Sequence, residues 1–229
     1  MPVDINYDNS ARFASYYYQI KEVLSFNPST VLEIGIGNNV VSSYLERCKI
    51  DVTTMDIDVS KEPDIVGDIR NLQKHLKEKY DVILCAEILE HIPFDDFKKI
   101  ISILPKYINK GAVITIPQAG LRFTIIFDFP LFHFKTLCVR LPIFYKKAKE
   151  HYWEINYRKS YSLKSIRKIM KDVFLIEKEY SIPANPYHRM FVLYKKSENL
   201  PLRERTSFLQ NQIHSNRYYP NHSHQENYE

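Results

Sequence analysis

The segment Thr30–Gly37 constrains the fold of this chain more than any other stretch, because it reads Thr-Val-Leu-Glu-Ile-Gly-Ile-Gly. It begins as a run of β-forming residues and ends in two glycines one residue apart, although the whole chain has only five glycines. A helix-compatible sequence follows from Asn39. A strand that ends in Gly-x-Gly and leads into a helix forms a loop that a ligand can approach closely. The sequence therefore predicts a ligand-binding loop at this strand end.

The residues around the glycines indicate which ligand the loop takes. A dinucleotide loop needs a third glycine at position 40, which is Val40, and no Gly-Lys-Ser/Thr motif of a phosphate-binding loop is present. Glu33 lies just before the loop, and a carboxylate there is a poor neighbour for a phosphate but a good one for a cation. S-adenosylmethionine has no phosphate and carries a sulfonium and an ammonium group. The loop therefore favours this cofactor over NAD, and an ordinary strand-turn-helix junction stays open as the alternative.

Four further segments have the composition of strands in an α/β sheet. The near-continuous apolar runs among them are typical of strands that are buried on both faces. The segments are Asp51–Asp56, Ile65–Ile69, Tyr80–Ala86 and Ala112–Pro117.

The second of the expected strands ends in an acid. Asp56 lies close to the offset of about 20 residues at which a Rossmann-like unit places a carboxylate on the ribose hydroxyls. Asp58 competes with it for this role, and a solvated turn acid is the alternative interpretation of either residue.

In this order, the motifs resemble those of class I S-adenosylmethionine-dependent methyltransferases. The likeness covers residues 28–118 by motif and 160–195 by topology. It implies a doubly wound, Rossmann-like α/β fold with a mostly parallel seven-stranded sheet, helices on both faces and an antiparallel last strand. One departure is Asn39, where many members have a third glycine, but asparagine tolerates a left-handed backbone better than most residues. The motifs that carry the likeness are Val31–Gly37, Met55-Asp56, Gly67-Asp68 and Asp81–His91.

The resemblance implies how the methionine part of the cofactor is held. Gly35 and Gly37 would let the backbone pass close to it, and Glu33 would bind its amino group. Residues 85–87, which include Ala86 and Glu87, would border the sulfonium.

The resemblance also assigns residues to the nucleoside part. Asp56 would bind both ribose hydroxyls, a task that suits a carboxylate. Asp68 would reach the adenine amino group, and Ile57 and Ile69 would pack on the two faces of the ring.

Catalysis is expected to depend on histidines. Glu87, Glu90 and His91 form a Glu-x-x-Glu-His pattern, whose side chains can lie on neighbouring faces of one turn. His91 is our candidate for a base or pocket residue, and His151 is a second catalytic candidate. The alternative is a divalent metal site on Glu87, Glu90 and His91, with His151 as a fourth ligand, because the pattern resembles metal-assisted ubiquinone-pathway O-methyltransferases and small-RNA 2′-O-methyltransferases. His151 and Trp153, two residues further on, can also be a packing anchor.

Residues 119–158 depart from the minimal fold. They contain a stretch dense in aromatic residues followed by a basic patch at 146–149, and we interpret them as a lid over the acceptor pocket. An interfacial surface for lipid or for an oligomer partner, or additional core, are the alternatives. Charged residues and prolines argue against a transmembrane helix in this segment. They are Asp128, Pro130, Lys135, Arg140 and Pro142.

The remaining elements follow from periodicity and composition. Helices are expected at 9–26, 39–48, 70–78 and 94–108, with a last helix beginning near Ser162. The final strands are expected at 174–181 and 190–195. Between them, residues 185–189 would form a turn in which His188 and Arg189 bind an acidic acceptor or are ordinary polar residues.

Length and composition set the outer bounds. The chain has 229 residues, and we expect one domain at 1–196 and a polar, disordered tail at 197–229. The net charge of +5 allows a nucleic-acid partner without requiring one. The three cysteines have no paired spacing, and the first residues do not resemble a signal peptide. We therefore expect a cytoplasmic protein with reduced thiols.

Taken together, the sequence predicts an S-adenosylmethionine-dependent methyltransferase. The first expectation for the acceptor is a hydroxyl of a small or lipid-like molecule. An RNA 2′-O-methyltransferase and a methyltransferase-fold module that binds without turnover are the alternatives, and an NAD-dependent oxidoreductase is disfavoured by Val40.

Overall fold

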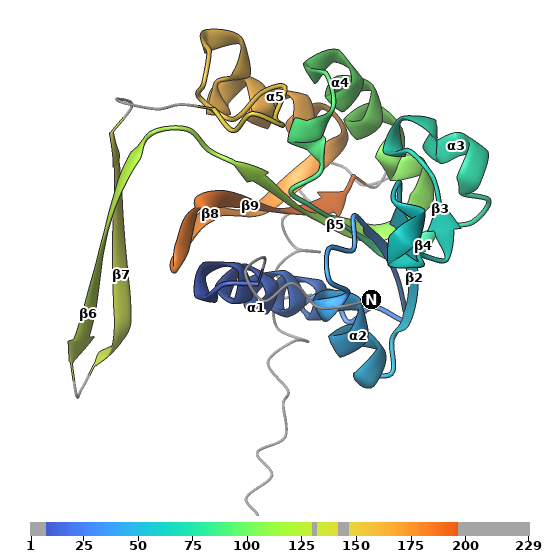
Figure 1. The fold of residues 1–229 in the computed structure, drawn as a ribbon, viewed down its shortest axis with the longest axis horizontal. Helices are drawn as coiled ribbons and strands as arrows, with labels where there is room; N and C mark the ends of the chain where they lie inside the picture. Colours follow the sequence, from blue (N-terminus) through green and yellow to red (C-terminus); the bar gives the residue numbers. More distant parts are fainter. Residues whose placement is uncertain (1–7, 130–131, 142–146, 197–229) are drawn as a thin grey trace, which may run out of the picture. The chain divides into compact units, whose positions relative to one another are not determined.

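The computed structural model describes residues 8–129, 132–141 and 147–196, with only the backbone described within 126–138. The polar tail predicted at 197–229 lies outside these residues. A seven-stranded sheet forms the centre of the described part (Figure 1). Its strands in chain order are β1 (Thr30–Ile34), β2 (Asp51–Asp56), β3 (Ile65–Val66), β4 (Tyr80–Ala86), β5 (Ile108–Pro117), β8 (Phe174–Ile182) and β9 (Asn185–Lys195).

The topology of the sheet is the one expected from the sequence. The strands lie in the order β3-β2-β1-β4-β5-β9-β8, and the first five pair in parallel. Only β9, the last strand in the described residues, runs antiparallel to its neighbours β5 and β8. The predicted Rossmann-like fold is therefore confirmed. The parallel strands end at the same edge of the sheet, which is where ligands bind in open α/β folds.

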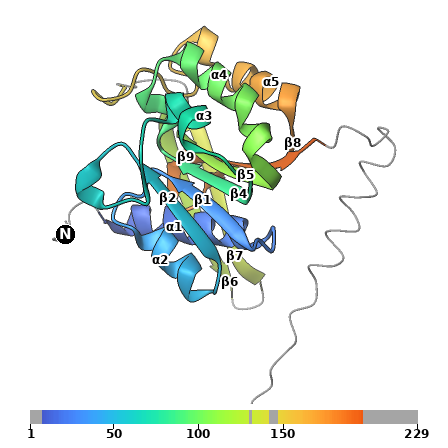
Figure 2. The same ribbon diagram turned by 90° about the vertical axis from the view of Figure 1, so that its right-hand side faces the viewer.

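Helices cover both faces of the sheet (Figures 1 and 2). Helices α1 (Ser10–Leu24) and α2 (Val40–Arg47) lie on one face, and α3 (Leu72–His75), α4 (Phe94–Ile103) and α5 (Leu163–Val173) lie on the other. Strand β4 shows why both faces are apolar: Val82 and Leu84 belong to the core under α1 and α2, whereas Ile83 and Cys85 belong to the opposite core. Side chains alternate between the faces of a strand, so a strand buried on both faces is a continuous apolar run.

Two helices are shorter than predicted. The segment expected as a helix at 70–78 is a 3₁₀ turn at Ile69–Asn71 followed by only four α-helical residues in α3. Leu76 then adopts an extended conformation with its side chain in the core, which ends the helix. The helix expected at 94–108 ends at Ile103 and continues as a 3₁₀ turn into β5.

The turn predicted at 185–189 is wrong, because these residues belong to β9. The reversal occupies Pro183 and Ala184, since Ile182 pairs with Asn185. The next pair of this ladder is Ser181 with Arg189, so β9 bulges at residues 186–188. A bulge accommodates Pro186, which cannot donate to a regular ladder. On the other side of β9, His188 pairs with Pro117 of β5.

The aromatic insertion begins as a hairpin of β6 (Leu121–Phe129) and β7 (Phe132–Leu141), which is separate from the main sheet. Arg140 holds its base by donating to the carbonyl oxygens of Gln118 and Pro186. One face of the hairpin carries exposed apolar side chains: Leu121, Phe123, Ile125, Val139 and Leu141. The interpretation of this insertion as a lid stays a prediction.

The chain then returns through residues 147–158. Ile155 bridges to Gln118, and Trp153 is fully buried against Phe94 and Phe97. The indole N–H of Trp153 donates to the carbonyl of Ile92 at 3.1 Å. Trp153 is therefore a packing anchor, and it fixes the neighbouring His151.

Candidate active site

The loop after β1 has the backbone that a close ligand approach requires. Gly35, Gly37 and Asn39 have φ angles of +82°, +54° and +61°. A methyl group on Gly35 would lie 2.1 Å from Cδ1 of Ile88, so only glycine fits there. Asn39 takes the left-handed conformation directly, which explains how the chain manages without a third glycine.

Glu33 is a buried carboxylate beneath this loop. It is the penultimate residue of β1, and it is 4% exposed. Burial raises the pKa of Glu33 to about 8, and hydrogen bonds from Ser42 oppose the rise. Oε2 has no hydrogen-bond partner among the described residues. A buried, unpartnered carboxylate oxygen fits a cationic group, which would supply the missing interaction.

Asp56 lies at the end of β2 and contacts the loop. It accepts hydrogen bonds from the N–H of Ile36 at 3.1 Å and of Asp58 at 2.9 Å, and Lys61 Nζ lies 3.0 Å from it. Asp58 instead accepts from Ser60 and caps an exposed turn. Of the two competing acids, Asp56 is therefore the one that contacts the glycine loop, although it does not line the pocket described below. The contact of Lys61 with Asp56 could not be predicted from the sequence, because it depends on a turn after β2 that no local pattern marks.

The residues predicted for the adenine end lie apart from the pocket described below. Asp68 forms an ion pair with the Arg70 guanidinium, which holds the pKa of that carboxyl below its usual range. Ile57 is exposed, whereas Ile69 is buried in the core. Only Ile57 of the two presents a free apolar surface. The adenine assignments stay predictions.

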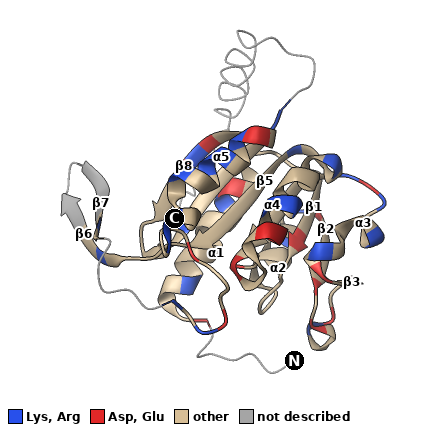
Figure 3. Ribbon diagram, turned by 90° about the horizontal axis from the view of Figure 1, so that it is seen from above, with Lys and Arg blue, Asp and Glu red and all other residues tan. Residues whose placement is uncertain are grey.

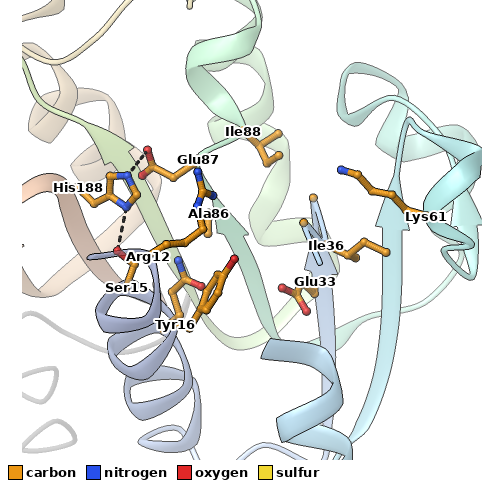
Figure 4. A pocket seen from close by; sticks show the side chains of 13 residues that line it. Arg12, Ser15, Tyr16, Glu33, Ile36, Lys61, Ala86, Glu87, Ile88 and His188 are labelled. Atoms are coloured by element: carbon orange, nitrogen blue, oxygen red, sulfur yellow. Dashed lines mark hydrogen bonds and ion pairs between the residues drawn. The ribbon is translucent and has the colours of Figure 1, made fainter. Parts of the chain in front are cut away.

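A pocket lies between the amino end of α1 and the carboxyl ends of β1 and β4 (Figure 4). It brings together five residues predicted to bind the cofactor, namely Glu33, Gly35, Gly37, Ala86 and Glu87. The residues that line it are Arg12, Ser15, Tyr16, Gln19, Glu33, Gly35, Ile36, Gly37, Lys61, Ala86, Glu87, Ile88 and His188. The sequence analysis did not foresee that Arg12 and Ser15 contribute, because helical periodicity shows which face of α1 is buried but not what it meets.

Glu87 and His188 form one wall of this pocket. Oε2 of Glu87 lies 3.2 Å from Nε2 of His188, and Ser15 Oγ lies 3.0 Å from Nδ1 of the same ring. Burial raises the pKa of Glu87 to about 8 and lowers that of His188 to about 3. Arg189, the other predicted acceptor residue, instead pairs with Glu179 outside the pocket.

His91 and His151 form a second group of titratable side chains. Their rings lie 4.8 Å apart, and Nε2 of each is 4.0 Å from Oε1 of the fully buried Glu90. Glu154 holds Nδ1 of His151 at 2.8 Å. Burial lowers the pKa of both imidazoles, that of His151 to about 4. Neither histidine lines the pocket.

The alternative metal site is only partly assembled. Ligand atoms of Glu90, His91 and His151 lie within 4.8 Å of one another. Glu87, the third predicted ligand, is not part of this group because it faces His188. A mixed oxygen and nitrogen donor set of this kind is compatible with a divalent cation.

Several buried oxygen atoms that lack a hydrogen-bond partner in the described part of the chain lie at or after the carboxyl ends of β4 and β5. They come from the ends of both strands and from the returning segment. We call this set the buried polar region, and it consists of Glu87, Glu90, Thr115, Gln118 and Glu154. Its polar groups adjoin the Glu87 wall, so it is the candidate acceptor region.

The family of this chain follows from its similarity to a known protein domain. The family described as "Methyltransferase domain" matches residues 10–173, which is more than half of the chain. This chain belongs to the methyltransferase-domain family. The resemblance to class I methyltransferases inferred from the sequence is thereby confirmed.

Among curated proteins, the methyltransferase chain is similar to the ubiquinone biosynthesis O-methyltransferase of Hydrogenovibrio crunogenus. The two are 26% identical over 106 residues, and the match covers 40% of this chain and 43% of that protein. The chain therefore matches less than half the length of this relative.

Solved methyltransferases share the fold. The N-methyltransferase NodS of Bradyrhizobium japonicum, in complex with S-adenosylhomocysteine, superposes with a TM-score of 0.56 at 13% identity, covering 83% of this chain and 90% of that one. The magnesium protoporphyrin IX methyltransferase of Synechocystis, with bound S-adenosylmethionine, gives 0.55 at 16% identity over 82% and 85% of the two chains. In the described residues, no helix is long and apolar enough to cross a membrane.

Proposed function

We propose that this methyltransferase uses S-adenosylmethionine and methylates a hydroxyl of a small or lipid-like molecule. The observation that carries the proposal is Glu33, a buried carboxylate with an unpartnered oxygen under the Gly-x-Gly loop. A phosphate cannot supply the cationic partner that this carboxyl lacks, whereas the ammonium group of S-adenosylmethionine can. The O-methyltransferase relative supports an oxygen acceptor.

Residues of this chain would hold the cofactor at its methionine part and at its ribose. Glu33 would bind the amino group, and the backbone at Gly35 and Gly37 leaves room for the methionine part. Asp56 would bind the ribose hydroxyls once they replace Lys61 as its partner. When bound, the cofactor supplies an electrophilic methyl group, so the protein mainly contributes alignment of the acceptor.

A hydroxyl acceptor must lose a proton, and His91 and His151 are our candidates for receiving it. Burial keeps both imidazoles neutral near pH 7, which is the form that accepts a proton. The contact with Glu154 fixes the ring of His151. A divalent cation on Glu90, His91 and His151 is the alternative role. An anomalous-difference map from Mn²⁺-soaked crystals would distinguish the two, with density at these residues favouring the cation.

RNA methylation is the second candidate, because the net charge is +5. Lys and Arg are interspersed with Asp and Glu in the view of Figure 3. RNA binding through phosphates would weaken steeply with salt. This candidate would be excluded if the protein did not bind a short RNA, or if its binding to that RNA did not depend on salt.

The two cysteines that the structure describes, Cys48 and Cys85, are free, which fits a cytoplasmic location.

A pair of variants tests the proposed function. Asp56→Ala should abolish methyl transfer from labelled S-adenosylmethionine to molecules in an aqueous or lipid extract. Asp58→Ala, a matched acid two residues away that only caps an exposed turn, should leave transfer unchanged. Equal activity in both variants would remove Asp56 from the site. Cofactor binding without transfer to any extract would favour a binding module.

A further inference from the structure

Glu87 has an uncommon backbone conformation at the point where the chain leaves β4. Its φ angle is +56°, which few residues other than glycine adopt. Its N–H donates to the carbonyl oxygen of Thr115 at 3.1 Å, which ties this conformation to β5. A strained residue that the surroundings hold in place is a marker of a functional position. Here the strain places a carboxylate on the pocket wall.

The contacts of His188 determine how Glu87 is held. The amide nitrogen of Asn185 can only donate, and it lies 3.3 Å from Nδ1 of His188, so Nδ1 is an acceptor. Ser15 Oγ approaches the same nitrogen at 3.0 Å. The ring hydrogen is therefore on Nε2, which donates to Oε2 of Glu87. His188 thus orients one oxygen of the carboxylate with a neutral donor and leaves its charge uncompensated.

The second oxygen of Glu87 has no such donor. Oε1 is buried and has no hydrogen-bond partner within the described ranges. The groups around Glu87 act in opposite directions: the side chains of Thr115 and Glu90 and the charge of Arg12 favour the ionised carboxylate, whereas the charge of Glu154 disfavours it. A buried carboxylate oxygen that lacks a hydrogen-bond partner carries a desolvation cost. A cation that binds beside it would offset this cost.

The pocket and the cofactor match in charge. Glu33 and Glu87 are the two acids among the residues that line the pocket. S-adenosylmethionine carries two cationic groups, the ammonium and the sulfonium. Glu33 lies under the glycine loop, where the amino group is expected, and Glu87 lies on a different wall, beside His188 (Figure 4). This leaves the sulfonium as the natural partner of Glu87.

We propose that Glu87, oriented by His188, is the counter-charge of the cofactor's sulfonium and makes the site prefer the methylated cofactor over its demethylated product. The proposal rests on the proposed use of S-adenosylmethionine. S-adenosylhomocysteine has the same ammonium, ribose and adenine, but its sulfur is uncharged. Glu87 therefore stabilises the substrate cofactor and has nothing to pair with once the methyl group has left, which favours product release.

Calorimetric titration with the two cofactors tests this proposal without knowledge of the acceptor. The quantity of interest is the ratio of the dissociation constant for S-adenosylhomocysteine to that for S-adenosylmethionine. Glu87→Gln keeps the size of the side chain and should lower this ratio about tenfold, or ~1.4 kcal/mol. Glu33→Gln is the matched control, because it removes a carboxylate whose partner is common to both molecules. It should weaken both and leave the ratio within about twofold.

The outcomes separate this proposal from the proposed function. A wild-type protein that binds neither molecule contradicts the proposed function itself. A wild-type protein that binds both, with a ratio that Glu87→Gln does not change, overturns the role of Glu87. If Glu87→Gln does not fold, His188→Ala should lower the ratio in the same direction, and His188→Gln, which keeps a donor for Glu87, should restore it. A ratio that is the same in both His188 variants and the wild type also overturns the proposal.

Discussion

Glu33→Gln should change how cofactor binding depends on pH. Burial raises the pKa of Glu33 to about 8, so this carboxyl is mostly protonated at neutral pH while the pocket is empty. It must lose its proton to bind an ammonium group. Between pH 6.0 and 7.5, affinity should therefore rise about tenfold per pH unit, or about 1.4 kcal/mol. Over this window the gain is roughly thirtyfold, or about 2 kcal/mol.

S-adenosylhomocysteine is the right ligand for this measurement, because its neutral sulfur makes no demand on Glu87. Calorimetric titration in two buffers with different ionisation enthalpies should show that the wild-type protein releases about one proton per ligand at pH 7. Glu33→Gln should release almost none, bind more weakly and lose the pH slope. A wild-type affinity that is flat across this window, or a slope that survives the substitution, would refute the reasoning about Glu33.

The same pKa makes a prediction for stability with the opposite sign. Between pH 4.5 and 8, the folded protein keeps a proton on Glu33 that the unfolded chain has lost. This group alone therefore makes the free energy of unfolding fall as pH rises through that window. Urea titrations at several pH values should show a smaller fall in Glu33→Gln than in the wild type.

Four further substitutions test the packing that positions the site. Gly35→Ala should lower the free energy of unfolding by about 1–3 kcal/mol and weaken cofactor binding. Ile88→Ala added to this variant removes the clash and should restore only part of the stability and of the binding, because the positive φ at position 35 remains. Trp153→Phe should lower the free energy of unfolding in urea by about 1–3 kcal/mol, since it loses volume and a buried hydrogen bond. Arg140→Ala should expose the hairpin base to limited proteolysis at a rate above that of the wild type, whereas an equal rate would show that its carbonyl contacts do not hold the base.

The parts of the fold that could be predicted are those that local sequence encodes. Strand β4 is a continuous apolar run because it is buried on both faces, and Glu33 and Gly35 lie in one short segment. The order of strands and helices then leaves few topologies. For this reason the sheet and the five pocket residues taken from its motifs were predictable.

The rest of the site depends on contacts between distant parts of the chain. Ser15, Glu87 and His188 come from α1, the end of β4 and β9, and no spacing rule relates them. The bulge that places His188 is hidden because Asn-Pro is typical of a turn. His151 reaches His91 only because Trp153 anchors the returning segment. These features follow from tertiary packing, which periodicity does not determine.

The most direct test of the central claim is calorimetric titration of the wild-type protein with S-adenosylmethionine and, separately, with NAD. The account predicts that S-adenosylmethionine binds with one-to-one stoichiometry, that Asp56→Ala weakens this binding at least tenfold, and that NAD gives no binding heat. Binding of NAD together with no binding of S-adenosylmethionine would contradict the assignment of this pocket to a cationic adenosyl cofactor.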